Sequence, residues 1–177
     1  MSMQYQSLTL PTIQQLNLTS KSFLEGGTIP QKFTCDGINI NPSLELSFIP
    51  NQTQSLAILM EDSDAPINTW IHWLVWNIPV MHLIPENLKV GVNGLNDFLR
   101  TFYCGPCPMN GKHRYVFKVY ALDVLLDLKP RSKKNEFERA ISGHVLAYGE
   151  LTAFFSRKQS DKNGIEKKVE KTLSPIQ

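Results

Sequence analysis

The sequence has no long apolar run and no strong excess of charge of either sign. None of its apolar stretches approaches the roughly 20 residues that a membrane-spanning helix needs. The formal net charge is only +2, so the composition does not indicate a nucleic-acid-binding protein. The first 20 residues lack the basic start and continuous apolar stretch of a secretory signal. We therefore expect a cytoplasmic protein, with a mature exported form, already trimmed of its signal, as the alternative.

Cysteine is scarce, because the chain has only three. Three cysteines form no obvious disulfide framework of the kind that holds small secreted domains together. Hydrophobic residues make up 42% of the 177 residues and charged residues 19%. That composition supplies enough apolar material for one domain with a real core. The sequence shows no internal repeat and no interior linker.

Short apolar segments separated by turn-rich loops predict a mainly β fold. Residues 43–48 alternate between polar and apolar side chains, as a half-buried strand does. Residues 55–60 are continuously apolar, which fits a strand buried on both faces. Segments 71–78, 114–122 and 148–155 are also rich in β-branched, aromatic or alternating residues. Many strands with few helices indicate a sandwich or a barrel, and periodicity does not distinguish the two.

One segment, residues 133–146, has helical spacing. Phe137, Ile141 and Val145 lie four residues apart and would share one face of a helix. Ser132 is the expected N-cap of this helix.

The two ends of the chain differ in composition from its middle. Residues 1–20 are polar and irregular, and we expect them to form an N-terminal arm. Residues 158–177 are rich in charge and poor in apolar side chains, which predicts a frayed or weakly helical tail. The domain itself is expected to span residues 21–157.

Two carboxylates follow the predicted strand at residues 55–60. Asp62 and Asp64 open a loop that also contains Pro66. Carboxylates at the end of a strand are well placed to face a pocket. The commoner use of Asp in such a loop is to cap a turn. Both interpretations stay open on this segment alone.

Two further segments carry donors for an anion. Trp70 and His72 share one face of a predicted strand, where His72 could bond to backbone, donate to an anion or act as a base. His113 and Tyr115 also lie two apart on one face. In the loop before them, the backbone N–H groups around Gly105 can form an anion-binding nest, and Pro106 would fix the shape of the loop. If these groups converge with Asp62 and Asp64, they form a pocket for an oxyanion.

The cysteines offer a competing function. The motif Cys104-Gly-Pro-Cys107 is also the dithiol motif of thioredoxin-like oxidoreductases. The helix and the βαβ pattern that surround that motif in such enzymes are missing here. A zinc site made of Cys35, Cys104, Cys107 and a histidine is a weaker alternative, because a second Cys-x-x-Cys pair is lacking. We expect a pocket without a metal or a cofactor.

An enzyme could use the same pocket. His72 or His113 could act as a general base oriented by an Asp, as in a hydrolase. No nucleophile elbow of the Gly-x-Ser-x-Gly type and no Gly-rich nucleotide loop accompanies them.

Four separated motifs then carry a family resemblance. DSDAP, WIHWLVWNIP, YCGPCP and GKHRYVFKVYAL stand in this order. They resemble the signature regions of the phosphatidylethanolamine-binding proteins, in the bacterial and archaeal Raf-kinase-inhibitor-like branch. The upstream segment IPQKFTCDGININPSLEL is similar to the entry segment of the bacterial form. The resemblance covers 22–157. Ser63 and Cys107 stand where the family usually has Pro.

The resemblance implies a β-sandwich with one or two peripheral helices and a small anion pocket at one end. It further implies a non-catalytic binding module for phosphate or a phosphorylated head group, a regulatory partner such as a kinase, and a homodimer. The Ala65–Pro66 peptide bond is cis in the family pattern. The pocket positions of the family fall on Asp62, Asp64, Pro66, Trp70, His72, Gly105, Pro106, His113 and Tyr115.

Overall fold

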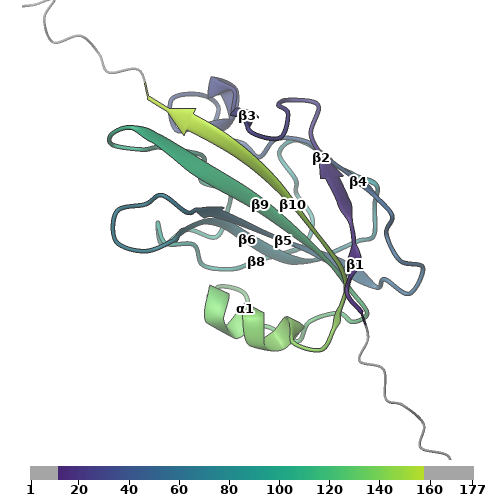
Figure 1. Ribbon diagram of the computed structural model, residues 1–177. Helices are drawn as coiled ribbons and strands as arrows, with labels where there is room; N and C mark the ends of the chain where they lie inside the picture. The colour runs from purple at the N-terminus through teal and green to yellow at the C-terminus, as the bar shows by residue number, and fades with distance from the viewer. Residues whose placement is uncertain (1–11, 158–177) are drawn as a thin grey trace, which may run out of the picture.

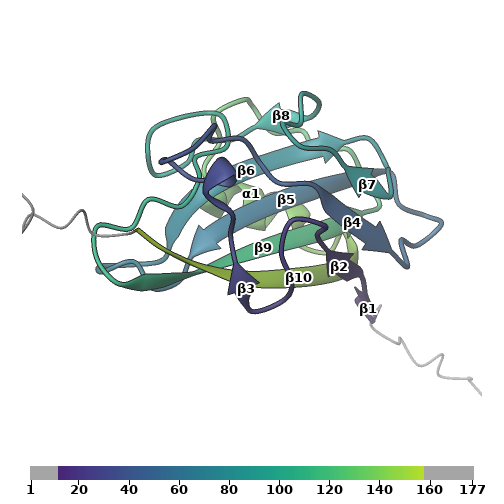
Figure 2. The same ribbon diagram turned by 90° about the horizontal axis from the view of Figure 1, so that it is seen from above.

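The computed structural model of the protein describes residues 12–157, which form two β-sheets and one α-helix (Figure 1, Figure 2). The larger sheet has seven strands in the order β1-β10-β9-β5-β6-β8, with β3 paired to β10, and the smaller sheet has the order β2-β4-β7. The strands of the larger sheet are β1 Gln14–Gln15, β3 Gly27–Thr28, β5 Ser55–Asp62, β6 Trp70–Ile78, β8 Val92–Asn93, β9 Lys112–Leu122 and β10 Val145–Ser156. Those of the smaller sheet are β2 Asn17–Thr19, β4 Leu44–Ser47 and β7 Leu83–Ile84.

The two faces of the larger sheet are covered differently. One face packs on the smaller sheet, and the core between them includes Leu46 of β4 and Met60 of β5. The other face carries α1 (Lys134–Ile141), whose Phe137 packs with Leu59 and Trp76. Figure 1 shows α1 on the opposite side of the sheet from β2 and β4. The mainly β sandwich with a peripheral helix is thus confirmed.

Strand β5 occupies the centre of the larger sheet. All eight of its residues are buried, and β6 and β9 pair with its two edges in antiparallel register. Its continuous apolar run therefore meets a core on each face, as the sequence predicted for residues 55–60. The alternation of β9 is also confirmed, because Tyr115 and Phe117 face the core between the sheets while Tyr120 packs beside α1.

Helix α1 is shorter than the sequence predicted. It ends at Ile141, Gly143 follows with a φ of +81°, and Val145 already begins β10. Val145 packs on the α1 side of the core from a strand, so its helical spacing is a coincidence of sequence. The first turn is closed by Glu136, whose carboxylate accepts the backbone N–H of Lys133 at 2.8 Å. Lys133, rather than Ser132, is the N-cap.

A buried carboxylate fastens α1 to the sheet. Glu61 of β5 is 3% exposed and pairs with Lys118 of β9 at 2.6 Å and with Lys134 at the start of α1. Burial raises the pKa of Glu61, but the bonds and charges of both lysines outweigh it and leave the pKa lowered. An ion pair of this kind holds the helix in place, since removing one partner would leave a buried charge uncompensated.

Part of the expected N-terminal arm belongs to the sandwich. Strand β1 runs parallel to β10 and strand β2 runs antiparallel to β4, so the segment crosses from one sheet to the other. Leu16 and Leu18 are 1% and 5% exposed. Burial of these two leucines explains why residues 12–20 are packed despite their polar composition. Residues 1–11 and the predicted tail at 158–177 lie outside the described residues.

Candidate ligand-binding site

A cavity of about 350 Å³ opens at one end of the larger sheet. In the antiparallel register Asp62, at the end of β5, lies between Trp70 at the start of β6 and Tyr115 near the start of β9. The strand ends therefore bring three sequence segments to one place. Six of the nine residues predicted from the sequence line this cavity: Asp62, Pro66, Trp70, His72, His113 and Tyr115.

Asp62 orients His113. The Nδ1 of His113 lies 2.7 Å from Oδ2 of Asp62, and the two side chains are 14% and 6% exposed. The other carboxylate oxygen of Asp62 accepts the backbone N–H of Asp64 at 3.0 Å. A carboxylate accepts, so the proton of neutral His113 sits on Nδ1 and leaves Nε2 for a ligand.

His72 is fixed by backbone. Its Nδ1 lies 2.6 Å from the carbonyl oxygen of Cys104, and its ring stands edge-on to Tyr115 and Phe98. Burial lowers the pKa of His72, while the carbonyl of Cys104 and the charge of Asp62 act in the opposite direction. A carbonyl can only accept, so neutral His72 carries its proton on Nδ1. Its Nε2 then offers a ligand an acceptor, whereas the sequence suggested a donor.

Tyr115 brings a hydroxyl group that lacks a partner. Its side chain is buried, and within the described residues its oxygen makes no hydrogen bond of good geometry, although the carboxylate of Asp62 and the backbone of Cys107 lie near it. Burial raises the pKa of Tyr115, and the negative charge of Asp62 raises it further. The group is therefore a neutral donor. Because an unsatisfied buried hydroxyl costs about 1–3 kcal/mol, a ligand or water that bonds to it gains this amount.

The loop that follows β5 is closed by Asp64 and Ser63. Asp64 does not line the cavity, and its Oδ2 accepts the backbone N–H of Arg114 at 3.0 Å. The backbone N–H of Ser63 donates to the carbonyl of Arg114, also at 3.0 Å. These bonds tie the loop to the start of β9, so Asp64 has the turn-closing use that the sequence left open.

The expectation of a cis peptide bond before Pro66 is wrong. The Ala65–Pro66 bond is trans, and residues 12–157 contain no cis bond. Trans is the favoured isomer of an X–Pro bond by about 0.5–1 kcal/mol. The loop joins β5 and β6 without needing the rarer form.

Gly105 and Pro106 do not line the cavity. The N–H of Gly105 donates to Oδ1 of Asn39 at 2.7 Å, and the carbonyl of Pro106 accepts the N–H of Cys35 at 3.1 Å. A Cβ on Gly105 would stand 2.1 Å from the carbonyl oxygen of Phe33. The close approach explains the glycine, and its N–H is already used. The predicted anion nest is therefore not formed by this group.

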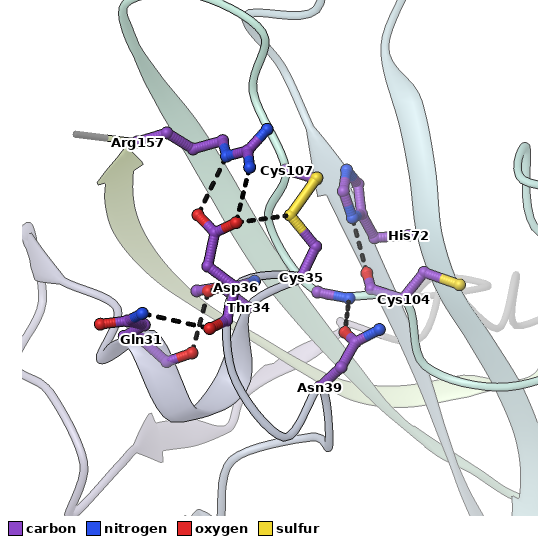
Figure 3. The surroundings of a disulfide bond; sticks show 10 residues. Gln31, Thr34, Cys35, Asp36, Asn39, His72, Cys104, Cys107 and Arg157 are labelled. Atoms are coloured by element: carbon purple, nitrogen blue, oxygen red, sulfur yellow. Dashed lines mark hydrogen bonds and ion pairs between the residues drawn. A yellow bond between two sulfur atoms is a disulfide. The ribbon is translucent and has the colours of Figure 1, made fainter. Parts of the chain in front are cut away.

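A disulfide joins Cys35 to Cys107, which lines the cavity (Figure 3). The alternative redox pair of Cys104 and Cys107 is therefore not favoured, because Cys107 is bonded to Cys35 and Cys104 is a free, half-buried thiol. Figure 3 shows its sulfur pointing away from the disulfide. Residues 103–108 form no helix that could bring the two thiols of the motif together.

Neither a metal nor an activated thiol is indicated by the described residues. Between residues 12 and 157, no group of three or more His, Cys, Asp or Glu side chains is placed to hold a metal ion. Burial raises the pKa of the Cys104 thiol, which is the opposite of the shift that activates a catalytic cysteine.

Apolar residues that the sequence analysis did not select complete the cavity. Phe98 is 38% exposed, and its ring packs on Trp70 and His72. The turn that presents Phe98 is held by buried Asn96, which donates to the carbonyl of His72 and accepts the N–H of Phe98. No periodicity or motif marks a single aromatic residue in a turn. The lining residues outside the predicted pocket are Ala65, Phe98, Cys107, Pro108, Met109 and Asn110.

The family profile described as phosphatidylethanolamine-binding protein matches residues 19–156. The chain belongs to this family. A UPF0098 protein of Pyrococcus horikoshii is 46% identical over 141 residues, which cover 73% of this chain and 71% of that protein. A UPF0098 protein of Methanothermobacter thermautotrophicus is 39% identical over 150 residues, covering 80% of this chain and 99% of the relative.

Two solved structures share the fold. The phosphatidylethanolamine-binding protein homolog CT736 of Chlamydia trachomatis superposes with a TM-score of 0.78 at 37% identity, over 82% of this chain and 99% of that one. YbcL of E. coli, described as a member of the mammalian family, gives 0.74 at 28% identity, over 81% and 99%. Membership of this family supports a binding-type module. In the part of the chain that is described, no helix is long and apolar enough to cross a membrane.

Proposed function

We propose that the cavity binds a small phosphate-like anion, either free or as a phosphorylated head group, and that the protein is a non-catalytic binding module. One observation carries the proposal. Two imidazole rings and an unpartnered phenol line a single cavity of about 350 Å³, and both rings are fixed on their Nδ1 side. Pockets of this size with a few convergent polar groups on apolar walls are typical small-molecule sites.

The Asp62–His113 pair supplies the charge. When His113 is protonated, its Nε2 becomes a donor and its positive charge offsets that of Asp62. Tyr115 adds a second, neutral donor.

The size of the cavity sets the class of ligand. The names of the family and of the C. trachomatis homolog point to a phosphorylated ethanolamine head group. A cavity of about 350 Å³ takes a head group but not acyl chains. A regulatory role on a kinase would place a phosphorylated side chain of the partner in the same cavity. Competition between a phosphoserine peptide and phosphoethanolamine tests that use.

The two enzyme alternatives receive less support. A thiol–disulfide oxidoreductase would need Cys104 and Cys107 together, and Cys107 is bonded to Cys35. A hydrolase with a covalent step would need a nucleophile beside the His113–Asp62 pair. The residues that line the cavity include no Ser, Thr or Lys, and their only cysteine is in the disulfide.

A titration with phosphoethanolamine, followed by calorimetry and by histidine ring resonances, tests the proposed function. We expect His113→Ala to weaken binding by about 100-fold, because it removes the charged donor. His144→Ala is the matched control, since His144 forms the same kind of pair with Asp123 at 2.8 Å on the surface. Unchanged affinity in both His113→Ala and His72→Ala would refute the site.

A further inference from the structure

The cavity presents an unusual set of hydrogen-bonding groups for an anion. His72 gives its Nδ1 proton to the carbonyl of Cys104 at 2.6 Å, so the neutral ring turns a lone pair toward a ligand. Tyr115 and protonated His113 can donate. A fully deprotonated oxyanion carries acceptors only, and it would leave the lone pair of His72 without a partner.

The surroundings of His72 decide whether it takes up a proton. Asp62 of β5 and Asp97 of the turn after β8 face it with negative charge, and Tyr115 of β9 and Cys104 face it as neutral groups. The side chain is 2% exposed. Burial outweighs the two carboxylates and lowers its pKa. His72 is therefore an acceptor at neutral pH.

The charges of the cavity add to the same conclusion. Its lining residues include no Lys and no Arg. Asp62 is bonded to Nδ1 of His113, and the nearby carboxylate of Asp64 accepts the backbone N–H of Arg114. The guanidinium of Arg114 lies over the ring of Phe154 instead. Protonated His113 therefore only balances Asp62. A dianion would bring two negative charges into a site with no net positive charge, which is costly where water is excluded.

We propose that the site takes its ligand in the acid form: a phosphate-like group keeps a proton on the oxygen that faces His72 and donates it to Nε2, while His113 and Tyr115 donate to the oxygens without protons. This inference rests on the proposed function and sharpens it. It distinguishes two classes of ligand, phosphomonoesters and phosphodiesters, which the proposed function treats alike. A phosphomonoester can carry the P–OH group, whereas a phosphodiester, such as the head group of an intact phospholipid, cannot.

Methyl phosphate and dimethyl phosphate form a matched pair of probes. At about pH 5 both carry one negative charge, because the second ionisation of a phosphomonoester lies near pH 6. Only methyl phosphate then has a P–OH. We expect the full-length protein to bind methyl phosphate about 10-fold or more tightly than dimethyl phosphate, since a site built around a donor leaves its acceptor unpaired with the analogue. Near pH 8 methyl phosphate should bind more weakly than at pH 5.

The outcomes separate this inference from the proposed function. Equal affinity for the two esters at pH 5 overturns the inference and leaves the anion site standing. Failure of both esters to bind at any pH overturns the proposed function and the inference with it. Stronger binding of methyl phosphate at pH 8 than at pH 5 would also overturn the inference, because the dianion would then be the ligand.

A variant gives a second, independent measurement. In His72→Gln the amide can turn its NH₂ group toward the ligand, so it can donate where His72 accepts. We expect the ratio of the two affinities to fall toward one in this variant and to stay at its original value in the surface control His144→Gln. A ratio that is the same in His72→Gln as in the natural protein would show that His72 only supports the fold. Nitrogen NMR of the ring reports directly whether Nδ1 keeps its proton in the complex.

Discussion

The molecule contains two histidine–aspartate pairs of nearly the same length in very different surroundings. His113 and Asp62 lie 2.7 Å apart with side chains 14% and 6% exposed. His144 and Asp123 lie 2.8 Å apart with side chains 47% and 41% exposed. An exposed pair contributes about 0–1 kcal/mol because water and salt screen it. We therefore expect the same contact to matter for stability and for ligand binding only where burial and a cavity accompany it.

The carboxylate of Asp62 accepts one more hydrogen bond than that of Asp123. It accepts the N–H of Asp64 in addition to the proton of His113, so it joins the loop after β5 to the start of β9. Within the described residues, the side chain of Asp123 makes a single hydrogen bond, with His144. Removing Asp62 should thus disturb both the loop and the ring, whereas removing Asp123 should free one ring only.

The largest loss of stability is expected when the disulfide beside the cavity is removed. The double variant Cys35→Ser, Cys107→Ser opens a link between residues 72 apart, and we expect the free energy of unfolding to fall by about 4 kcal/mol. Urea unfolding without reductant measures it. Ring resonances of His72 and His113 should shift while those of His144 stay. Cys104→Ser is the control, and a comparable loss in that variant would contradict the prediction.

The second prediction compares the two aspartates. Asp62→Ala leaves the N–H of Asp64 and the Nδ1 proton of His113 without their acceptor, so we expect a loss of about 2 kcal/mol of stability. Asp123→Ala should change stability by no more than about 0.5 kcal/mol. Denaturant unfolding of each variant measures its free energy of unfolding, and the two values can be compared if the dependence on denaturant concentration is the same. Equal losses would mean that exposure does not distinguish the pairs.

A smaller effect follows from the lowered pKa of His72. The unfolded chain binds the proton more readily than the folded one, so stability rises with pH between the lowered pKa and the ordinary value near 6.5. As the pH falls from about 7.5 to 5.5 the protein should lose stability through this group, at no more than about 1.4 kcal/mol per pH unit. Comparison of unfolding at both pH values with His72→Gln, which cannot titrate, isolates the loss. An identical pH dependence in the variant would contradict it.

The smallest effect concerns the surface pair. A double-mutant cycle on His144 and Asp123 should give a coupling of about 0.5 kcal/mol or less. The coupling should vanish in about 1 M salt, where screening acts over roughly 3 Å. A cycle at low and at high salt measures both values. A coupling above about 1 kcal/mol that survives the salt would remove the contrast with the buried pair.

The sequence predicted the five longer strands, β4, β5, β6, β9 and β10, because each has a local cause, and it missed the five strands of two or three residues. The continuous apolar run at 55–60 predicts a strand that is buried on both faces. The alternation at 114–122 predicts a strand that is buried on one face. The helix was predicted five residues too long at its end, 146 against Ile141, because the spacing of Val145 agrees by coincidence with a helical face. Gly143, with its positive φ, is the local signal that ends the helix.

The parts of the site that escaped prediction depend on partners far away in sequence. The side chain of Asn39 accepts the N–H of Gly105, which lies 66 residues away in the sequence. Cys35 forms a disulfide with Cys107, which lies 72 residues away. No local spacing announces either contact. The direction of the His72 proton depends on the carbonyl of Cys104, which only the folded chain places there. Residue types therefore located the cavity, while the roles of its atoms needed the structure.

The disulfide also bears on the predicted cytoplasmic location, which stays a prediction. Disulfides persist mainly in oxidising compartments, although intracellular proteins of hyperthermophiles are an exception. Assays of ligand binding should be done both with and without reductant, because Cys107 is part of the cavity wall.

The bond between Cys35 and Cys107 turns the middle of the chain into a closed ring. Strands β4 to β8 lie on this ring, while β9 and β10 lie on the free arm that follows it. The mostly exposed segment 63–70 is also on the ring. A protease that cuts there linearises the ring without separating the two pieces, so the nicked protein remains one covalent molecule until a reductant is added. New chain ends could therefore be engineered beside the cavity without dividing the protein.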